Sequence, residues 1–590
     1  MEGRDKVFDE PLRPAGSPLP ALADNPSVGV RVRRALRLDW CLPLAVIALA
    51  AGLRFAGLGS QPLWLDEGYS WWDAHQTLAD LWSLVPQCDP HPPLYFVLLK
   101  AWTDALGDGT VALRALSALL GVATTVAVVF AGREIDRRIG WVAGLLFALT
   151  PFQVEFGHEA RPYTLLCFGA SLIAFGALRI ARVARVAPLA HQAPQVPGTA
   201  SQPAGPAAPW FGSVLRLLGS PVESALAGWV ALLVGGIIVL WTNNTSVLII
   251  AALCAAFVLL LALDVRSRHL LKPLLFVVAI VVLLWLPYVP TLLEQARGVE
   301  SDFWIPKPEG WRFANELRFV VSLNAFDAVW WAVLALVGGL ILMWRRGAWR
   351  QALLLGFLIA GPVGLNYALS MTIKPIFIAR ALIGVAPAVV IVTAAAVMLI
   401  KRPWMRYGTL AVALVAHAAA LGLWFENYQG KEPWDRIATE VASGHPLSLS
   451  AKSDVVVLVA ANELALPLSH AFEDIHAAVP LQGAPANFPS PGMTARYPSG
   501  KCAPSVQGQN LAAIRKAVGG HHTVYFITRK NNVYDPGNGI AAFLASLGLK
   551  QTAVTTYNPG SLEVHEFVAP QNAPRVFAHV QLPPGSPGAN

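Results

Sequence analysis

The hydropathy pattern divides the chain into long apolar segments separated by polar connections. A helix needs about 20 apolar residues to cross roughly 30 Å of hydrocarbon, and about eleven segments meet this criterion. They lie near residues 38–58, 111–131, 141–156, 163–180, 226–242, 247–263, 273–292, 326–344, 352–370, 381–400 and 407–424. The pattern therefore predicts an α-helical polytopic membrane protein with about eleven transmembrane helices.

Positive charge is distributed unevenly over the connections. Arginine and lysine gather on alternate connections and in the polar N-terminal tail, at residues 1–37, 133–138, 179–185, 266–272, 345–350 and 401–406. Cytoplasmic loops carry an excess of these residues, so this side is predicted to be cytoplasmic. The odd number of spans then places everything after residue 425 in the periplasm. We expect a multi-pass protein of the bacterial inner membrane.

Two connections differ from ordinary loops. The first periplasmic loop, 59–109, is long and acidic, and long loops inside compact proteins are usually functional. The cytoplasmic segment 186–209 is rich in Pro and Ala, which predicts a disordered linker.

After residue 425 the hydropathy falls to the values of a soluble domain. Buried strands are predicted at 454–460 and 522–528, with helices near 464–472 and 539–547. Residues 426–578 are therefore predicted to form a small periplasmic α/β domain, and 579–590 a tail.

The composition agrees with a membrane protein. Hydrophobic residues make up 55% of the chain and charged residues 14%, whereas soluble domains have about a quarter charged residues. The net charge of +8 arises from the ends of apolar segments, so no nucleic-acid partner is expected. The 5 cysteines have no paired spacing that would indicate a zinc site. Cys88 and Cys502 are both predicted to be periplasmic, where a disulfide between them could form.

Polar motifs occupy the predicted periplasmic ends of the spans. The first, WLDEGYSWW at 64–72, contains the adjacent carboxylates Asp66 and Glu67. A positioned carboxylate that takes a hydroxyl proton is a general base. Acidic residues also favour helix N-termini without any catalytic role, so the motif alone leaves both interpretations open.

The second motif, CDPHPPLYF at 88–96, places His91 before two prolines. Prolines favour the start of a helix, so an amphipathic helix is predicted from here to about Leu106. His91 either binds an anionic phosphate at this helix start or is a solvated loop residue.

The third motif, HEARPY at 158–163, lies in a tight loop between two spans. Charges between apolar helices are usually paired or functional. Either Glu159 and Arg161 pair and stabilise the loop, or Arg161 binds a phosphate through its guanidinium fork. In the second case Glu159 orients Arg161 or binds a metal ion.

The fourth motif, KPIFIAR at 374–380, supplies Lys374 and Arg380. These cations neutralise charge that develops on a phosphate leaving group, or they only snorkel at a helix end. Arg54, near the outer end of the first span, has the same two interpretations.

Taken in order, WLDEGYSWW, DPHPPLYF, LRALSALLG (which contains Arg114) and HEARPY resemble the C superfamily of membrane glycosyltransferases, GT-C. Within it the chain is similar to the bacterial branch related to protein O-mannosyltransferases, lipid A aminoarabinose transferases and rhizobial lipopolysaccharide-core transferases. FWIPKPEGW at 303–311 and KPIFIAR resemble the same branch. The resemblance covers residues 38 to about 402, most of a transmembrane glycosyltransferase domain at 38–425.

The resemblance implies an inverting transfer of a hexose or pentose from a polyprenyl-phosphate donor to an acceptor on the periplasmic face. Asp66 would be the catalytic base, and Glu67 would support it or bind the acceptor. The residues implied at the donor phosphate are His91, Arg161, Lys374 and Arg380. The supporting residues implied are Arg114, His158, Glu159 and Tyr163.

Several properties stay open at this point. WTNNT at 241–245 stands where the family often has aromatic and histidine residues, which puts the choice of sugar or acceptor in doubt. No cofactor is assigned; a divalent cation (Mg or Mn), if bound, would have Asp66 and Glu159 as ligands. The acceptor is a glycan, a glycolipid such as lipopolysaccharide, or a protein. We expect the C-terminal domain to bind it; the alternatives are that this domain closes over the site or only stabilises the helical bundle.

Two other classes of protein compete with a transferase. A transporter or flippase for a lipid-linked sugar would carry ionisable residues near the bilayer midplane, where this sequence has almost none. A catalytically inactive scaffold of the same fold would not need the Asp66 and Arg161 motifs.

Overall fold

The computed structural model describes residues 42–190, 225–298, 305–321, 328–427, 430–443, 454–484, 486–490, 511–530, 535, 537–558 and 561–570. From residue 46 onward, the described helices, the first loop and the C-terminal sheet belong to one compact unit.

The first predicted periplasmic loop consists of short helices. They are α2 (Leu65–His75), α3 (Asp80–Ser83), α4 (Val85–Cys88) and α5 (Leu94–Leu106). α5 starts directly after Pro93 and ends at Leu106, as the Pro-Pro pair predicts. The side chains of the WLDEGYSWW motif therefore project from a helix rather than from an irregular loop.

Apolar helices follow over most of the remaining chain. They are α6 (Thr110–Arg133), α7 (Arg137–Leu149), α8 (Pro151–Gly157), α9 (Tyr163–Ala190), α12 (Leu226–Leu240), α13 (Val247–Leu263), α14 (Leu271–Trp285), α15 (Val289–Gly298), α16 (Trp311–Val320), α17 (Ala328–Arg345), α18 (Trp349–Thr372), α19 (Ala386–Met398) and α20 (Pro403–Asn427). Short 3-10 turns join them, namely η1 (Asn244–Ser246), η2 (Val265–Leu270), η3 (Leu286–Tyr288) and η4 (Ala379–Val385).

Among the described residues, 7 helices are long and apolar enough to cross a membrane, or up to 8 if α7 and α8 form one bent span. These two helices meet at 63°, where Pro151 interrupts the helical hydrogen bonds. Three shorter apolar helices, Leu42–Phe55, Leu226–Leu240 and Val329–Arg345, coincide with further predicted segments. A multi-pass helical membrane protein is therefore confirmed, whereas the count of about eleven spans is not.

Several helices expose apolar side chains outward. On α20, Val412 is 69% and Val415 is 68% exposed, and on α17 Trp331 is 73% exposed. A helix that is apolar on all sides needs an apolar solvent as well as a protein core. These surfaces are suited to contact with lipid.

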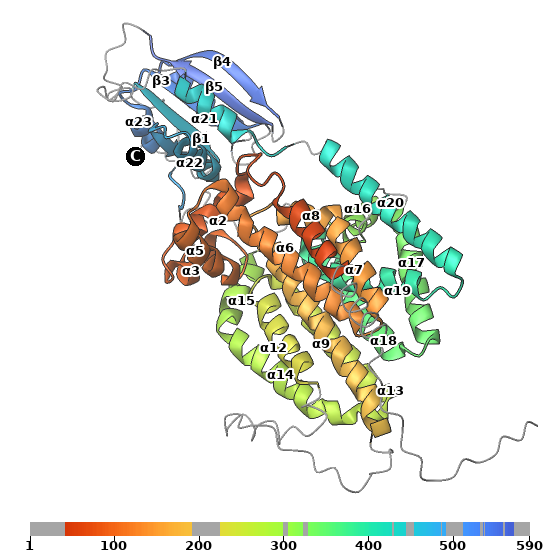
Figure 1. Cartoon of the computed structure of the whole chain (residues 1–590). Helices are drawn as coiled ribbons and strands as arrows, with labels where there is room; N and C mark the ends of the chain where they lie inside the picture. The colour runs from red at the N-terminus through yellow and green to blue at the C-terminus, as the bar shows by residue number, and fades with distance from the viewer. Residues whose placement is uncertain are drawn as a thin grey trace, which may run out of the picture. The chain divides into compact units, whose positions relative to one another are not determined.

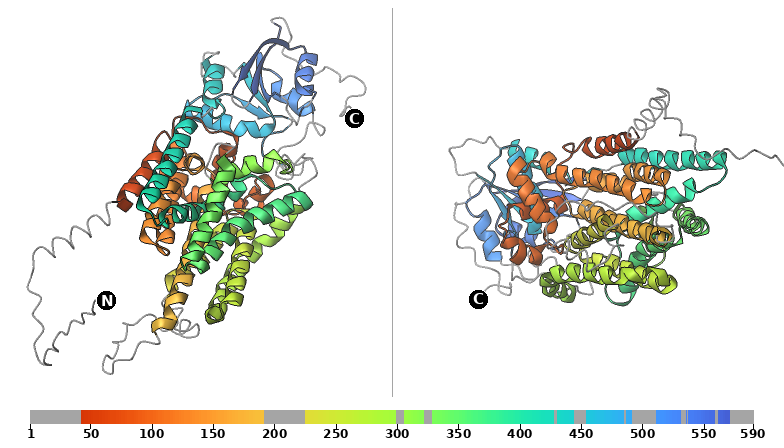
Figure 2. Two further views of the ribbon diagram at one scale, coloured as in Figure 1. Left: turned by 90° about the vertical axis from the view of Figure 1, so that its right-hand side faces the viewer. Right: turned by 60° about the horizontal axis from the view of Figure 1, so that its bottom comes forward.

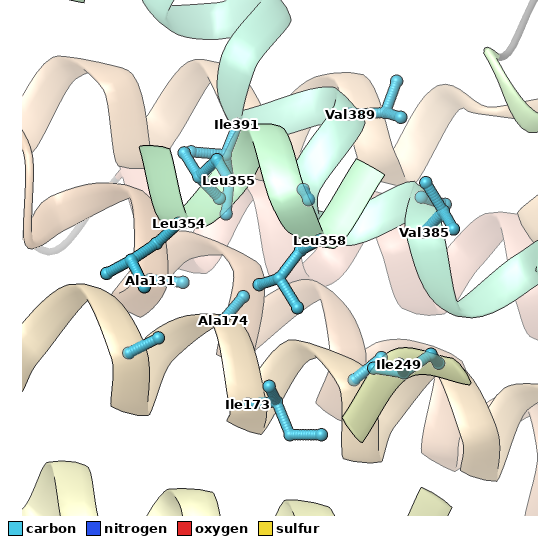
Figure 3. Close-up of a cluster of buried hydrophobic side chains, with 14 of the residues drawn as sticks. Ala131, Ile173, Ala174, Ile249, Leu354, Leu355, Leu358, Val385, Val389 and Ile391 are labelled. Carbon is cyan, nitrogen blue, oxygen red and sulfur yellow. The ribbon is translucent and has the colours of Figure 1, made fainter. Parts of the chain in front are cut away.

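The interior of the bundle is packed closely by aliphatic side chains. Residues of α6, α9, α13, α18 and α19 meet there, and Figure 3 shows Ile173, Leu354, Leu358 and Ile391 among them. Side by side, α9 and α12 approach closely (Figure 1), because a Cβ atom at Gly176 would lie 2.5 Å from the carbonyl oxygen of Gly228. Small residues at helix interfaces allow such contacts in membranes.

The C-terminal region folds around one five-stranded sheet with strand order β2-β1-β3-β5-β4. Its strands are β1 (Val455–Ala460), β2 (Leu481–Gly483), β3 (Thr523–Arg529), β4 (Lys550–Tyr557) and β5 (Leu562–Val568). The β2–β1 and β1–β3 pairs are parallel, and the β3–β5 and β5–β4 pairs are antiparallel.

Helices cover both faces of this sheet (Figure 2). One face packs against α21 (Trp434–Ser443), η5 (Asn462–Leu464) and α22 (Ala465–Asp474), and the other against α23 (Leu511–Val518) and α24 (Gly539–Ser546). Every residue of β1 is buried because successive side chains point to opposite, covered faces. The predicted small α/β fold is confirmed.

Some predicted segments lie outside the described residues. They include the N-terminal tail 1–37 and the C-terminal tail 579–590. The predicted linker 186–209 is described only up to residue 190, and that part was predicted wrongly, because it continues the helix α9.

Candidate active site

A cavity of about 560 Å³ lies where the first loop, the HEARPY loop and the C-terminal domain meet. Its polar wall contains Asp66, Tyr69, Asp89, His91, Asn243, Asn244, Arg161, Tyr163, Gln295, Arg380 and Glu463. Its apolar wall contains Leu248, Leu292, Ile305, Leu369, Ile376 and Ile378. The cavity thus joins a charged region to a hydrocarbon-like surface.

Asp66 and Glu67, the neighbouring carboxylates of the first motif, point in different directions from the helix α2. Both lie in its first turn, where the helix dipole favours acidic side chains. Successive residues of an α-helix point about 100° apart. As a result Asp66 lines the cavity, whereas Glu67 points into the protein and is fully buried.

Asp66 forms an ion pair across the cavity wall. Its Oδ2 atom accepts a hydrogen bond of 3.0 Å from the guanidinium of Arg380. Both side chains are partly exposed, Asp66 at 24% and Arg380 at 27%. Residues more than 300 positions apart in the chain therefore place an acid and a cation at one accessible point.

Arg161 fixes the start of α2 against the second motif. Its Nη1 donates to the backbone oxygen of Asp66 at 3.0 Å and to Oδ2 of Asp89 at 3.1 Å. Its Nη2 lies 3.2 Å from Nδ1 of His91. Arg161 is therefore held rigidly in the cavity wall beside His91.

His91 and Asp89 form a hydrogen-bonded dyad. The Nδ1 atom of His91 lies 2.6 Å from Oδ1 of Asp89. Burial raises the pKa of Asp89, but the charges of Arg161 and His91 outweigh burial and hold it well below its usual range. Because an ionised carboxylate only accepts hydrogen bonds, Nδ1 carries the proton.

Glu67 belongs to a buried cluster of charges. Arg114 donates to both of its carboxylate oxygens at 2.7 Å, and the Nζ atom of Lys431 donates at 2.7 Å. The backbone N–H of Ala160 adds a bond of 3.0 Å. Burial raises the pKa of Glu67, but the cations Lys431 and Arg114 outweigh it and lower the value to about 2. These contacts anchor α2 to the helical bundle.

The predicted pairing within the HEARPY loop does not form. In the described part of the chain the guanidinium of Arg161 pairs with Asp89, while Glu159 faces Lys431 at 3.7 Å. Glu159 therefore does not orient Arg161. Burial raises the pKa of Glu159 to about 8.

The other residues of that loop divide between cavity and interior. Tyr163 lines the cavity and packs edge-on against the ring of His91. His158 donates from Nε2 to the backbone oxygen of Leu53 at 3.0 Å, and burial lowers its pKa to about 4. His158 is thus held at the interface between helices.

The remaining predicted cations are not equivalent. Arg380 lines the cavity, but Lys374 is not among the lining residues. Arg54 is fully buried and donates to the backbone oxygens of Ala148 and Phe147. The interpretations of Arg54 as a phosphate ligand or a snorkelling residue were both wrong, because its guanidinium binds helix carbonyls inside the bundle.

The predicted metal ligands do not form a donor set. Asp66 faces Arg380 and Glu159 faces Lys431, so each carboxylate lies beside a positive charge. No group of three His, Cys, Asp or Glu side chains suited to a metal ion occurs in the described ranges. The residues present do not fit a divalent cation.

The described cysteines differ in their oxidation state. Cys88 is disulfide-bonded, whereas Cys167 and Cys254 are free thiols. Cys502, the predicted partner of Cys88, lies outside the described residues.

The sequence did not single out several residues of this site. Asp89 belongs to the second motif and Tyr69 to the first, but neither residue was predicted to have a role. Lys431 and Glu463 come from the C-terminal region, more than 350 residues from the α2 residues that they contact. No local pattern marks them, because their contacts with α2 are made only in the folded chain.

Comparisons with known proteins identify the fold. No protein-family model matches the sequence, and no curated protein matches it. Two crystal structures of ArnT from Cupriavidus metallidurans are similar at 13% identity, one bound to undecaprenyl phosphate (TM-score 0.53) and one in the apo state (TM-score 0.54). The similarity covers 90% of this chain and 99% and 98% of those chains, respectively.

An archaeal oligosaccharyltransferase, AglB from Archaeoglobus fulgidus, gives a TM-score of 0.46 at 11% identity, over 90% of this chain and 75% of that chain. The similarity to ArnT extends over the helical bundle and the C-terminal domain together. The chain therefore shares the fold of these ArnT structures, as the resemblance of its motifs to the C superfamily of membrane glycosyltransferases predicts.

Proposed function

We propose that the protein transfers a sugar from a polyprenyl-phosphate donor to a hydroxyl acceptor, on the periplasmic side of a bacterial inner membrane. The ArnT structure that shares this fold was solved with undecaprenyl phosphate, which is a lipid of this class. Asp66 is the general base, and Arg161, Arg380 and His91 bind the donor phosphate. Glu67, Arg114 and Glu159 support the site from the protein interior.

The reaction is a single displacement at the anomeric carbon of the sugar. The acceptor oxygen attacks from the side opposite to the phosphate, and its proton passes to the carboxylate of Asp66. The bond between the anomeric carbon and the phosphate oxygen breaks, so the polyprenyl phosphate leaves with an additional negative charge. The anomeric configuration inverts. A positioned carboxylate base contributes about 10²- to 10⁴-fold to such a rate.

Positive side chains in the cavity stabilise the leaving phosphate. Arg380 and Arg161 line the cavity, and their guanidinium groups can bind phosphate oxygens in a fork geometry. His91 is proposed to add a third contact to the phosphate, and the hydrogen bond that its Nδ1 donates to Asp89 orients the ring. Preorganised donors of this kind act mainly on charge that develops in the transition state.

The apolar wall is suited to the lipid part of the donor. Leu248, Leu292 and Leu369 line the same cavity as Asp66 and Arg380. A polyprenyl chain lying against them would leave its phosphate at the cations. Lys374, which does not line the cavity, is proposed to act from outside, where it attracts anionic donor.

The ion pair between Asp66 and Arg380 is the observation that carries the proposal. It holds the carboxylate of Asp66 and the guanidinium of Arg380 3.0 Å apart in a cavity that apolar side chains also line. A donor phosphate would compete for Arg380 and release the Asp66 carboxylate toward the acceptor. In this way donor binding would activate the base.

The test is transfer of label from a panel of radiolabelled polyprenyl-phosphate sugars into membrane extracts, with wild type and Asp66→Asn. We expect one donor to label the extract with wild type and little or no label with Asp66→Asn. Asp104→Asn is the matched control, because Asp104 belongs to the same loop and is 62% exposed. Equal labelling by wild type and Asp66→Asn would remove Asp66 as base. No labelling with any donor would favour a transporter or a scaffold.

A further inference from the structure

Glu463 is the part of the cavity wall that the C-terminal domain supplies. It lies in η5, directly after the carboxyl end of β1, the central parallel strand. Ligands of open α/β sheets bind at this end of the strands. The same cavity contains Asp66, and the two carboxylates influence each other electrostatically. Sheet domain and membrane helices therefore face one common space.

A short hydrogen bond fixes the Glu463 carboxylate. The hydroxyl of Tyr69 donates to Oε2 at 2.6 Å. Tyr69 follows Asp66 by three positions on α2, so both side chains lie on the same face of that helix. Oε1 of Glu463 makes no hydrogen bond with the described residues, which leaves an acceptor atom for a bound molecule.

The surrounding packing prevents Glu463 from moving away. A Cβ atom at Gly68 would lie 2.8 Å from the ring of Pro467, so α2 and α22 are in direct backbone contact. The ring of Phe488 packs edge-on against both Tyr69 and Trp72. Lys431, which precedes α21, is joined to Glu67 beneath α2. The C-terminal domain is thus held against α2 by contacts outside the cavity lining.

We propose that Glu463 binds the acceptor, by accepting a hydrogen bond from a sugar hydroxyl adjacent to the one that Asp66 deprotonates. This inference rests on the proposed function and deepens it. Glu463 would be a substrate-contacting residue contributed by the C-terminal domain, and the acceptor would present a polyhydroxylated sugar rather than an isolated hydroxyl.

The chemistry of the position favours a hydroxyl over the donor phosphate. A carboxylate repels a phosphate, and the phosphate-binding cations Arg161 and Arg380 already occupy the cavity wall. A carboxylate oxygen accepts strong hydrogen bonds from hydroxyl groups. Tyr69 holds one oxygen and leaves the other, in the arrangement that a sugar edge with neighbouring hydroxyls can use.

The experiment measures how the transfer rate depends on each substrate separately. Wild type, Glu463→Ala and Glu463→Gln are reconstituted as full-length protein in lipid vesicles. The radiolabelled polyprenyl-phosphate sugar used by wild type and a membrane extract are then varied in turn. We expect Glu463→Ala to raise the half-saturating extract concentration about 10- to 100-fold, as for loss of a hydrogen bond to a charged group. The half-saturating donor concentration should not change.

Two further variants separate binding from structure. Glu473→Ala changes an exposed carboxylate of α22 outside the cavity and should behave as wild type. Tyr69→Phe removes the bond to Glu463 and should raise the half-saturating extract concentration less than Glu463→Ala does. If Glu463→Ala does not fold, the isosteric Glu463→Gln, which keeps the acceptor oxygen for Tyr69, gives the same comparison.

The outcomes distinguish the two proposals. An unchanged extract dependence, or an equal effect on donor and extract, overturns the role of Glu463 while the transferase function stands. Absence of transfer by wild type with every donor overturns the proposed function itself.

Discussion

Asp66 and Glu67 are neighbours in the sequence with the same chemistry, yet they lie in opposite environments. Glu67 is fully buried and bonded to two cations and a backbone N–H. Asp66 is partly exposed in a cavity and bonded to Arg380. One carboxylate therefore has all its hydrogen bonds within the protein, whereas the other faces a space that a substrate could enter.

The comparison shows how one helical turn can hold a buried, fully paired carboxylate beside a carboxylate that lines a cavity. A buried ion cluster contributes little net stability relative to an apolar core, but breaking it leaves uncompensated charges. The Glu67 cluster is thus a rigid anchor for α2. Asp66 can then be positioned without being enclosed, because the anchor is supplied by the next residue.

Asp66→Asn should break the chemical half of this comparison. We expect kcat to fall about 10²- to 10⁴-fold, since the variant cannot take the acceptor proton. The unfolding temperature in detergent should stay that of wild type. A large loss of stability together with the loss of activity would mean that Asp66 is an anchor like Glu67.

Glu67→Ala should break the structural half. Arg114 and Lys431 would remain buried without their shared partner, at a cost of about 3–5 kcal/mol in the free energy of unfolding. The measurement is thermal or denaturant unfolding of the purified protein. Asp104→Ala, which breaks the exposed pair with Lys100, should cost less than about 0.5 kcal/mol. Similar costs for the two variants would contradict the anchor.

Acid should weaken the anchor with a defined sign. The pKa of Glu67 is lowered in the folded protein from 4.5 to about 2, so ionised Glu67 stabilises the fold above pH 4.5. This contribution, about 3 kcal/mol, should be lost as the pH falls from about 4.5 to about 2. Unfolding of wild type and Glu67→Gln over this range checks it. The variant should lose less stability; equal losses would locate the acid sensitivity elsewhere.

Arg380→Gln tests whether the cavity binds the donor phosphate through Arg380. Loss of one charge-assisted hydrogen bond to the donor phosphate should lower kcat/KM for the donor about 10- to 100-fold. Arg380→Lys keeps the charge and should recover part of the loss. Steady-state transfer rates at several donor concentrations provide the test. Full activity of Arg380→Gln would show that the pair with Asp66 is unrelated to the donor.

Glu159→Gln should have the smallest effect. Burial raises the pKa of Glu159 to about 8, so at neutral pH its carboxyl is largely protonated and resembles an amide. Below pH 4.5, where the carboxyl is protonated in the folded and in the unfolded chain, we expect the variant to change the free energy of unfolding by less than about 1 kcal/mol. Wild type should lose stability as the pH rises from 4.5 toward 8, because only the unfolded chain ionises readily. Unfolding curves across this range should be flatter for the variant.

Part of the site was predictable because it depends on local sequence. The start of α5 follows from two prolines, and the acidic first turn of α2 follows from helix electrostatics. The order of the motifs was enough to indicate the superfamily, and the similarity to ArnT confirms the fold. Such local patterns predict structure correctly because a helix forms its backbone hydrogen bonds within its own segment.

Other predictions failed because the contacts involved are long-range. Pairing of Glu159 with Arg161 was one of the two interpretations of their loop, but Arg161 meets Asp89, 72 residues away, and Glu159 faces Lys431. Arg54 was interpreted as a phosphate ligand or a snorkelling residue, but its guanidinium binds helix carbonyls inside the bundle. Such partners depend on how helices pack, and packing is not encoded in any single motif.

The sequence by itself determined that the chain is a multi-pass helical protein with a small α/β domain, because apolar length and residue alternation act locally. It also indicated the motifs whose residues line the cavity. Only the tertiary structure decided that Asp66 faces the cavity and Glu67 the interior. It also brought Lys431 and Glu463, from the far end of the chain, into contact with Glu67 and Tyr69 of α2. The physical reason is that hydropathy depends on each residue alone, whereas the partner of a charge depends on which helices meet.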